Sequence, residues 1–539
     1  MAPSALPTVG ELLLARAGDE RVGLLFEDES WTWDDHVRRS LERGAWLRSV
    51  GSGHVALLLD NVPEFSFLLG AAALSGSVIV GLNPTRRGRE LERDVAVTDC
   101  TLVITESRHA AALDGLALPP VLVVDSPDWA STLAPFRGRS DADAGPNRGE
   151  SLVMLIFTSG TSGEPKAVRV TDQKIARPGI AMAQRGSIGR ADVAYLSMPM
   201  FHSACVMQAW APALAAGATM VLRRKFSASG FLPDIRRYGV TYFHYVGKPM
   251  AYLLATPDRA DDADNPLRVA AGNEAAPLDI ERFARRFGCD VQEGFGSTEG
   301  GIYLSRTPDT PPGALGLAPE GVDILNPDSG RPVSVAKFDA SGRLLNADEA
   351  IGELVNTSGP GQFAGYYGNE EADAERMRGG MYWSGDLAYR DADGFVYFAG
   401  RSIEWLRVDG ENLAAAPIER VLARYAPVSQ VAVYAVPAAD VGDELMAALL
   451  LRADAVFDPT TFSSFLAAQA DLGTKWTPRY VRVSKALPAT DTNKVLKRLL
   501  AKEAWRCHDD VWVRDGKELE YRPMTTAERE RSPRGAAQG

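Results

Sequence analysis

Apolar runs of strand length alternate with amphipathic, helix-like segments through the first half of the chain. The apolar runs lie at 55–60, 77–83, 101–106, 121–125, 153–160, 218–224 and 240–246. Between them, stretches such as PEFSFLLGAAALSG and DIERFARRFG have the spacing of helices that bury one side. Buried strands alternating with helices are typical of parallel sheets with helices on both faces. The pattern therefore predicts an α/β fold with doubly wound sheets.

The pattern changes twice further along the chain. From about 312 to 400 it shows short strands separated by turns, which predicts a small β-rich subdomain. After 400, an amphipathic helix, a strand at 431–436 and mixed segments predict a smaller α+β domain. We therefore expect a large domain at 1–400, a connection at 401–404, a C-terminal domain at 405–524 and a disordered, charged tail at 525–539.

The most apolar stretch, FSFLLGAAALSGSVIVGLN, is short for a membrane span and is interrupted by Gly70, Ser75, Gly76 and Ser77. It predicts a buried helix, a stop at glycine and a buried strand. The first residues also lack the basic region, apolar core and cleavage site of a signal peptide. We expect a cytoplasmic protein without a span, and peripheral contact with a membrane stays open.

Composition narrows the class of protein. Among 539 residues, 45% are hydrophobic and 24% charged, which is typical of globular proteins. The net charge of −12 argues against general nucleic-acid binding, which needs a basic face. The cysteines at 100, 205, 289 and 507 are widely spaced, without the spacing of a metal site, and suit a reducing compartment.

The stretch TSGTSGEPK, at 158–166, follows an apolar strand and combines glycines, hydroxyls and a lysine. Backbone amides of such a loop can converge on an anion at the carboxyl end of a strand. The spacing is not that of a Walker P-loop, because Lys166 follows Pro165 and precedes Ala167. No lysine precedes Lys166 in the chain, so its place here is informative. The alternative is a flexible surface turn.

Five further segments carry candidate chemistry: MPMFHSA (198–204), AAGNEAAP (270–277), GFGSTEG (294–300), YWSGDLAYRD (382–391) with FAGR (398–401), and LPATDTNKVLKR (487–498). Each has an ordinary structural explanation when taken alone. A Thr-Glu pair often caps a helix, and a lone histidine beside apolar residues is usually structural. An aspartate can belong to a hairpin, and a lysine near a helix start is usually a solvated charge.

Together, in this order, the segments resemble the acyl-adenylate-forming superfamily, which includes acyl-CoA synthetases and adenylation domains. The resemblance covers roughly 8–515 and looks closest to the fatty-acid-transport-protein and very-long-chain acyl-CoA synthetase branch, including bacterial fatty-acid and steroid side-chain CoA ligases. Two positions depart from the family pattern. Asn493 replaces a glycine, and Ile403 stands at the usual hinge position, with Glu404 next.

The resemblance implies a nucleotide site. Phe295 would stack on adenine, Asp386 would bond the ribose hydroxyls, and Arg401 would also reach the nucleotide. The implied ATP-binding residues are Thr158, Ser159, Gly160, Thr161, Ser162, Gly163, Lys166, Gly272, Asn273, Glu274, Phe295, Gly296, Ser297, Thr298, Asp386 and Arg401.

The resemblance also implies the catalytic residues Lys494, Thr298, Glu299 and His202. Lys494 would bridge the substrate carboxylate and the α-phosphate, Thr298 would bond that phosphate, and Glu299 would bind Mg²⁺. His202 would be a gate between the acyl pocket and the CoA channel. The implied CoA channel contains Gly410 and Glu411, and the implied acyl pocket contains His202, Trp210, Tyr242, Phe243 and Tyr245.

The implied function is an ATP-dependent acyl-CoA ligase that works through an acyl-AMP intermediate, with ATP, Mg²⁺ and coenzyme A. The C-terminal domain would swing about 401–404 between the two half-reactions. An apolar pocket favours a fatty or steroid side-chain acid over an amino acid. The alternatives are a fatty acyl-AMP ligase that loads a carrier protein and a non-catalytic lipid-binding or uptake protein. The acid itself and the oligomeric state do not follow from the sequence.

Overall fold

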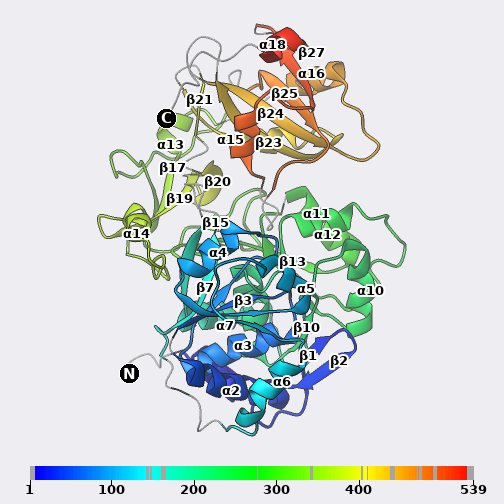
Figure 1. The fold of residues 1–539 in the computed structure, drawn as a ribbon. Coiled ribbons are helices and arrows are strands. Elements are labelled where there is room, and N and C mark those ends of the chain that lie inside the picture. The colour runs from blue at the N-terminus through cyan, green and yellow to red at the C-terminus, as the bar shows by residue number, and fades with distance from the viewer. Residues whose placement is uncertain are drawn as a thin grey trace. The chain divides into compact units, whose positions relative to one another are not determined.

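The computed structural model describes residues 6–51, 53–140, 145, 148–158, 165–275, 277–339, 344–401, 405–408, 411–437, 443–469, 472, 476–489, 495–516 and 518–530. The chain divides into two compact units (Figure 1). Unit 1 comprises residues 1–305 and 360–378, and unit 2 comprises residues 306–359 and 379–539. Each unit is described separately below.

Unit 1 contains a six-stranded sheet in the order β6-β5-β3-β4-β7-β8. Its strands are β3 (His54–Leu58), β4 (Ile79–Gly81), β5 (Cys100–Thr105), β6 (Val121–Val123), β7 (Leu152–Thr158) and β8 (Lys166–Thr171). All neighbours are parallel except β7 and β8, which pair as an antiparallel edge. The five apolar runs at 55–60, 77–83, 101–106, 121–125 and 153–160 are confirmed as strands of this sheet.

A second, eight-stranded sheet in unit 1 has the order β14-β13-β12-β11-β9-β10-β1-β2. Its strands are β1 (Val22–Phe26), β2 (Glu29–Thr32), β9 (Val193–Leu196), β10 (Thr219–Leu222), β11 (Tyr242–Val246), β12 (Val269–Asn273), β13 (Asp290–Gly296) and β14 (Tyr303–Ser305). The interior is parallel, and β2 and β14 form antiparallel edges. The prediction of mainly parallel, doubly wound sheets is confirmed.

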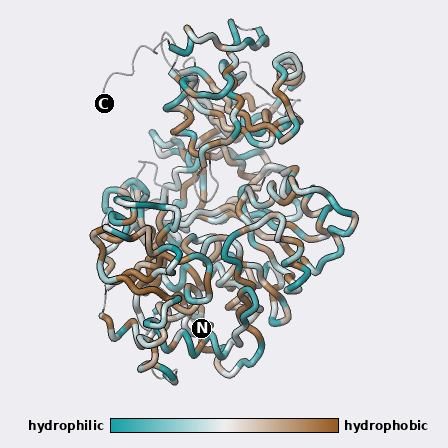
Figure 2. Tube along the Cα trace, turned by 45° about the vertical axis from the view of Figure 1, so that its right-hand side comes forward, coloured by the Kyte–Doolittle hydropathy of each residue, from teal (hydrophilic) through white to brown (hydrophobic). Residues whose placement is uncertain are grey.

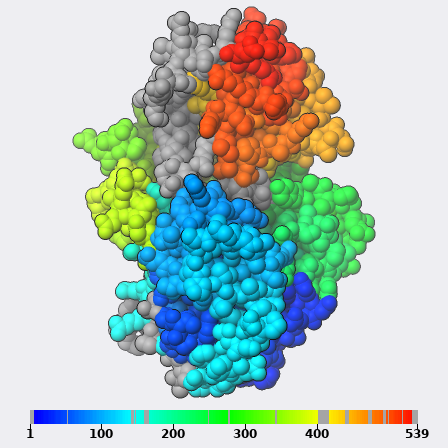
Figure 3. Space-filling model, in the orientation of Figure 1, coloured from blue at the N-terminus to red at the C-terminus, as the bar shows by residue number. Residues whose placement is uncertain are grey.

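The helices of unit 1 connect these strands. They are α1 (Val9–Leu14), α2 (Trp33–Val50), α3 (Pro63–Ser75), α4 (Arg89–Ala96), α5 (Ser107–Ala110), α6 (Pro127–Leu133), α7 (Asp172–Arg185), α8 (Ser203–Cys205), α9 (Ala211–Ala216), α10 (Ala228–Tyr238), α11 (Lys248–Leu254), α12 (Pro277–Phe287) and α14 (Glu370–Arg376). Short turns η1 (Ala111–Leu113) and η2 (Ala134–Phe136), a π-helix η4 (Val206–Trp210) and the strand β18 (Met377–Arg378) complete the unit. The segment around 100–140 covers much of one face of this unit (Figure 3).

The most apolar stretch of the sequence folds as predicted. It forms α3, which ends at Gly76, followed by the buried strand β4. Hydrophobic residues gather along the inner elements of the trace, whereas the outer loops are mostly hydrophilic (Figure 2). Within the described ranges, no helix is both long and apolar enough to cross a bilayer. The four cysteines are all free.

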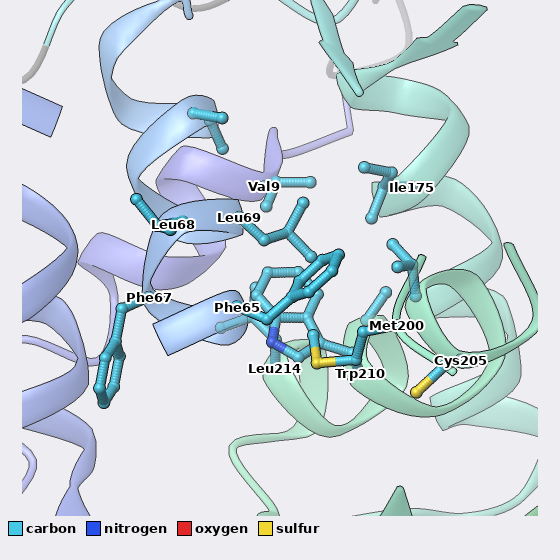
Figure 4. Packing of buried hydrophobic residues seen from close by; sticks show 14 of the residues in the cluster. Val9, Phe65, Phe67, Leu68, Leu69, Ile175, Met200, Cys205, Trp210 and Leu214 are labelled. Carbon is cyan, nitrogen blue, oxygen red and sulfur yellow. The ribbon is translucent and has the colours of Figure 1, made fainter. Parts of the chain in front are cut away.

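The main core of unit 1 is shared by both sheets and by the helices that pack on them. Phe65 and Leu69 of α3 lie beside Trp210, Met200 and Leu214, which come from the segment between β9 and β10 (Figure 4). Trp210 is fully buried, and its indole Nε1 donates a hydrogen bond of 2.8 Å to Ser66 Oγ. A buried tryptophan that has found an acceptor contributes both packing and a satisfied polar group.

Ser66 also makes a hydrogen bond to a buried histidine. Because Ser66 Oγ accepts from Trp210, its hydroxyl hydrogen is available for His36 Nε2, 2.8 Å away. That arrangement assigns the neutral form to His36, which is completely buried on α2. Burial lowers the pKa of His36 from 6.5 to about 3.

Acidification is therefore expected to destabilise unit 1. The unfolded chain binds a proton at His36 below pH 6.5, whereas the folded chain does so only near pH 3, so stability falls as the pH drops through that window. The loss at pH 5 is on the order of 2 kcal/mol. Urea unfolding at pH 7 and pH 5 measures it. A His36→Gln variant should lose less stability over the same interval, and an equal loss in both proteins would contradict this origin.

Unit 2 contains two further sheets. The first has the order β15-β20-β19-β17-β16, and the second has the order β22-β21-β24-β25-β26-β27 with β23 paired to β24. The strands are β15 (Gly316–Leu317), β16 (Val322–Leu325), β17 (Gly352–Asn356), β19 (Met381–Arg390), β20 (Phe395–Arg401), β21 (Trp405–Val408), β22 (Glu411–Ala414), β23 (Val428–Pro437), β24 (Asp443–Leu451), β25 (Tyr480–Ser484), β26 (Asp510–Arg514) and β27 (Tyr521–Pro523). The helices are α13 (Ala347–Ala350), α15 (Ala415–Leu422), α16 (Pro459–Ala467), α17 (Lys497–Glu503) and α18 (Thr526–Glu530).

Two features of unit 2 bear on the predicted domains. Residues 306–359 and 379–400, the β-rich region, group with the C-terminal residues in unit 2. From the sequence we placed this region in the domain at 1–400. The domain boundary at 400 stays a prediction. Residues 526–530, expected to be disordered, form α18 instead. Arg529 explains the difference, because its guanidinium donates to the carbonyls of Cys507 and Asp509 at 3.0 and 3.1 Å. The remaining tail, 531–539, lies outside the described residues.

Candidate active site

The glycine-rich stretch connects two antiparallel strands at the edge of the six-stranded sheet. Thr158 ends β7 and lies opposite Lys166, which begins β8. The predicted residues between them, Ser159, Gly160, Thr161, Ser162 and Gly163, lie outside the described residues. Lys166 Nζ is 3.0 Å from Glu375 Oε2 and 5.4 Å from the centroid of the Tyr366 ring. The stretch therefore belongs to a strand-to-strand connection, not to a strand-to-helix turn.

Two predicted segments meet after β13. Thr298 Oγ1 lies 2.7 Å from Ser203 Oγ, and Ser203 directly follows His202. His202 precedes the short helix α8, and its ring lies 4.3 Å from that of Phe201, measured between centroids. The structure thus brings the histidine segment and the Thr-Glu segment together, although 95 residues separate Ser203 from Thr298.

Glu299 is surrounded by groups that favour its charged form. Tyr366 Oη donates to Glu299 Oε1 at 3.0 Å, and Arg376 Nε donates to Tyr366 Oη at 3.3 Å. Burial alone would raise the pKa of Glu299, but the charges of Arg376 and Lys174, together with hydrogen bonds, outweigh it and hold the pKa below its usual range. Glu299 is therefore ionised at neutral pH.

Lys174 is a buried cation of this cluster that the sequence did not reveal. It lies in the first turn of α7, with 2% of its surface exposed, and its Nζ donates to the carbonyl of Arg169 at 3.2 Å. Burial lowers the pKa of Lys174 to about 8, against the opposing effect of Glu299. Sequence reasoning also missed Tyr366 and Arg376, because nothing in their local pattern indicates that they reach Glu299.

The predicted adenine segment lies at the end of β12. Gly272 packs under the neighbouring strand, where a Cβ would lie 2.3 Å from the carbonyl oxygen of Tyr245, so only glycine fits. Glu274 follows in a left-handed conformation, with φ of 66°, which is uncommon for a residue with a side chain. Asn273 Oδ1 is buried and has no hydrogen-bond partner among the described residues. A buried acceptor of this kind can take a hydrogen bond from a donor on a ligand.

A small pocket of about 10 Å³, room for about one water molecule, lies between the eight-stranded sheet and the helices α7 and η4. Strand alternation explains its lining, because Tyr242, Ala271, Gln292 and Gly294 lie on one face of neighbouring strands. The lining residues are Met182, Arg185, Gln208, Tyr242, Ala271, Gly272, Gln292, Glu293, Gly294 and Tyr303.

Four of the residues predicted for an acyl pocket do not line this pocket: His202, Trp210, Phe243 and Tyr245. Phe243 and Tyr245 point to the opposite face of β11, where they pack in an aromatic cluster with Phe231. Trp210 belongs to the main core. Only Tyr242 of the four aromatic residues lines the pocket. The composition of the acyl pocket stays a prediction, since the sequence shows that these residues are apolar but not which face of a strand they occupy.

The predicted ribose aspartate lies in unit 2. Asp386 is on β19, opposite Arg401 at the end of β20, and only 7% of its surface is exposed. The preceding Gly385 donates its backbone N–H to Glu353 Oε1 at 2.7 Å. Glu353 is itself buried and was missed by sequence reasoning. It holds the backbone that presents Asp386.

The remaining predicted residues fall partly outside the described ranges. Lys494, Gly410 and 402–404 are among those outside, whereas Glu411 begins β22. The described residues before and after Lys494 are joined by backbone hydrogen bonds. Ala489 and Val495 form an isolated antiparallel bridge, and the N–H of Leu496 donates to the carbonyl of Pro488 at 2.7 Å.

Comparison with known proteins adds a family and a fold. A model of the family described as AMP-binding enzyme matches residues 14–367. A medium/long-chain-fatty-acid–CoA ligase, FadD17, of Mycobacterium marinum is 52% identical over 521 residues, covering 95% of this chain and 99% of the relative. A steroid-22-oyl-CoA synthetase of Rhodococcus jostii is 48% identical over 532 residues, covering 97% and 96%. The crystal structure of ATP-bound MatB from Rhodopseudomonas palustris superposes with a TM-score of 0.79 at 21% identity, covering 92% of this chain and 99% of that one.

Proposed function

Because the chain belongs to the AMP-binding enzyme family, we propose that it is an ATP-dependent acyl-CoA ligase for a fatty or steroid side-chain carboxylic acid. The observation that carries the proposal is the similarity over nearly the full chain to a fatty-acid–CoA ligase and a steroid-22-oyl-CoA synthetase. The family match also spans the glycine-rich stretch together with Lys174, Glu299 and Tyr366.

The reaction solves two problems of carboxylate chemistry. A carboxylate is a poor electrophile, because oxide is a poor leaving group and the negative charge repels nucleophiles. In the first step the acid attacks the α-phosphorus of ATP, which gives acyl-AMP and releases pyrophosphate. In the second step the thiol of coenzyme A attacks the acyl carbon, and AMP leaves. Each step depends on holding two reactants together that would otherwise separate or repel each other.

Residues of unit 1 would hold the nucleotide. The stretch from Thr158 to Lys166 supplies backbone amides and an ammonium group for the phosphates. Asn273 Oδ1, a buried acceptor with no partner among the described residues, suits the amino group of adenine. The nucleotide site would also include Phe295, Gly296 and Ser297. Thr298, which lies beside Ser203, would bond the α-phosphate.

Glu299 fits a Mg²⁺ ion that arrives with the nucleotide. Its carboxylate is ionised, and Mg²⁺ commonly binds one or two protein carboxylates together with substrate phosphates. The charges of the nearby Arg376 and Lys174 help to keep this carboxylate ionised. When bound, Mg²⁺ would neutralise charge on the phosphates during transfer.

Residues of unit 2 would complete each half-reaction. Asp386 accepts two hydrogen bonds from the ribose, and Arg401 reaches the same nucleotide. Lys494 offsets the repulsion between the acid and the α-phosphate. The C-terminal domain would then rotate about 401–404. This rotation would remove Lys494 from the reaction site and bring in Gly410 and Glu411, which would line the CoA channel. His202 would be the gate of that channel.

The acyl group would bind beside His202 and Tyr242, two residues of the predicted acyl pocket. A carrier-loading ligase remains the second candidate, because it forms the same acyl-AMP and differs only in the acceptor thiol. A non-catalytic lipid-binding protein is disfavoured by the joint presence of Thr298, Glu299, Asp386 and Lys494.

AMP release with ATP, Mg²⁺ and coenzyme A tests the proposal across short, medium, long and very-long-chain fatty acids and steroid side-chain acids. We expect CoA-dependent release with at least one group. Acyl-AMP that forms but never reaches coenzyme A would favour the carrier-loading ligase. No product from any acid would contradict the ligase assignment.

A further inference from the structure

A hydrogen bond between two hydroxyl groups links two segments of unit 1 that are remote in the sequence. Ser203 Oγ and Thr298 Oγ1 lie 2.7 Å apart. Among the described residues, this is the only hydrogen bond that either hydroxyl makes. Both side chains are half-buried, so a ligand can still reach them. Thr298 belongs to the proposed nucleotide site, whereas Ser203 has no role in the proposal so far.

The direction of this hydrogen bond depends on what Thr298 binds. A hydroxyl group has one hydrogen to donate and two lone pairs that accept. An anionic oxygen of the α-phosphate can only accept, so Thr298 must give its single hydrogen to the phosphate. Ser203 must then donate to Thr298 Oγ1. The two hydroxyls and the phosphate would form a chain in which each hydrogen bond polarises the next.

The backbone that leads to Ser203 is held by a buried asparagine. Asn61 follows β3, and only 3% of its surface is exposed. Asn61 Nδ2 donates to the carbonyl of Met198 at 2.7 Å, and Asn61 Oδ1 accepts from the N–H of Met200 at 2.8 Å. Both ends of one side-chain amide therefore fix the same short stretch of backbone.

The next residues are held as closely. A Cβ on Gly81 of β4 would lie 2.9 Å from the Cα of Phe201, so the chain passes β4 at a distance that only glycine allows. The N–H of His202 then donates to the carbonyl of Pro199 at 3.1 Å. Ser203 thus begins α8 from a backbone that β4 and the end of β3 hold in place. A hydroxyl presented in this way is already oriented before a ligand arrives, which is what electrostatic preorganisation requires.

We propose that Ser203 is a positioning residue, which donates to Thr298 Oγ1 and thereby directs the hydrogen of Thr298 toward the α-phosphate of the nucleotide. The inference rests on the proposed acyl-CoA ligase function and adds a residue to its nucleotide site. The alternative is that Ser203 only begins a helix. The two explanations differ, because a positioning residue has no effect once the group that it positions is removed.

A double-mutant cycle separates the two explanations. Thr298→Val keeps the shape of the side chain but removes its hydroxyl, and it should lower the rate of acyl-AMP formation by about 10²-fold. Ser203→Ala should lower this rate by about tenfold in the original protein, but by less than about twofold in Thr298→Val. Ser203→Thr keeps a hydroxyl and should restore most of the lost rate. Exchange of labelled pyrophosphate into ATP measures all of these rates.

Calorimetric binding of AMP and of adenosine gives a second readout that needs no turnover. The two ligands share the nucleoside and differ in the phosphate, so Ser203 should matter only for AMP. In Ser203→Ala we expect the Kd for AMP to rise by about fivefold or more, and the Kd for adenosine to change by less than about twofold. Ser131→Ala is the control, because this exposed hydroxyl donates to the carbonyl of Pro127 in the same helix, α6. It should leave both Kd values unchanged.

The outcomes distinguish this inference from the proposed function. Equal weakening of AMP and adenosine binding in Ser203→Ala, or additive losses in the double-mutant cycle, would overturn the inference and leave the ligase function standing. If the original protein binds AMP but forms no acyl-AMP from any acid, the ligase function fails, and the binding measurements still decide the role of Ser203. An original protein that binds neither AMP nor ATP would overturn both.

Discussion

Lys494→Ala is expected to lower the rate of acyl-AMP formation by about 10²–10³-fold, while thioester formation from supplied acyl-AMP proceeds at a similar rate to that of the original protein. The reason is electrostatic. The substrate carboxylate and the α-phosphate are both anionic, and a lysine between them offsets their repulsion as they approach. Once acyl-AMP exists, this repulsion is gone. Exchange of labelled pyrophosphate into ATP measures the first step, and release of AMP from supplied acyl-AMP with coenzyme A measures the second.

Lys502→Ala is the control for this experiment. Lys502 is exposed near the end of α17 and is not one of the proposed site residues, so its removal changes the net charge of the same part of the sequence alone. It should leave both half-reactions unchanged. Equal loss of the two half-reactions in Lys494→Ala would contradict the assigned role and point to a general defect in substrate binding or folding.

Glu299→Gln is expected to reduce acyl-AMP formation by about 10²-fold and to raise the Mg²⁺ concentration needed for half-maximal activity. The glutamine keeps a carbonyl oxygen that can accept from Tyr366 Oη, 3.0 Å from the carboxylate in the original protein. What it removes is the negative charge that Lys174 and Arg376 help to maintain. Initial rates across a Mg²⁺ titration, with ATP in fixed excess, separate weaker metal binding from slower chemistry.

Tyr366→Phe is the matched variant for Glu299. It removes the hydrogen bond to the carboxylate but leaves the charge, so the loss in acyl-AMP formation should stay within about tenfold and Mg²⁺ dependence should change little. Thermal unfolding of both variants checks that the cluster remains folded. A Mg²⁺ titration of Glu299→Gln that matches the original protein would overturn the metal-binding role.

Local patterns in the sequence predicted much of unit 1. Continuous apolar runs identified the buried parallel strands of the six-stranded sheet, because such strands are covered on both faces and need apolar residues throughout. The helix, glycine stop and strand around Gly76 followed from the same signal. Strands with mixed polarity, such as β2 and β8, were not identified. Their polar residues face solvent or partners at sheet edges, and only the assembled sheet shows where those edges are.

The sequence by itself determined the family, the order of its motifs and the residue types that could handle a nucleotide, since these are local features of composition and spacing. Only the tertiary structure decided which distant groups meet. Folding places Lys174, Tyr366 and Arg376 around Glu299. It also places Tyr242 in the lining of a pocket, whereas Phe243 and Tyr245 pack in a hydrophobic core on the other face of the strand. The physical reason is that the pKa of a carboxylate and the lining of a pocket depend on neighbours in space, and folding chooses those neighbours from remote parts of the chain.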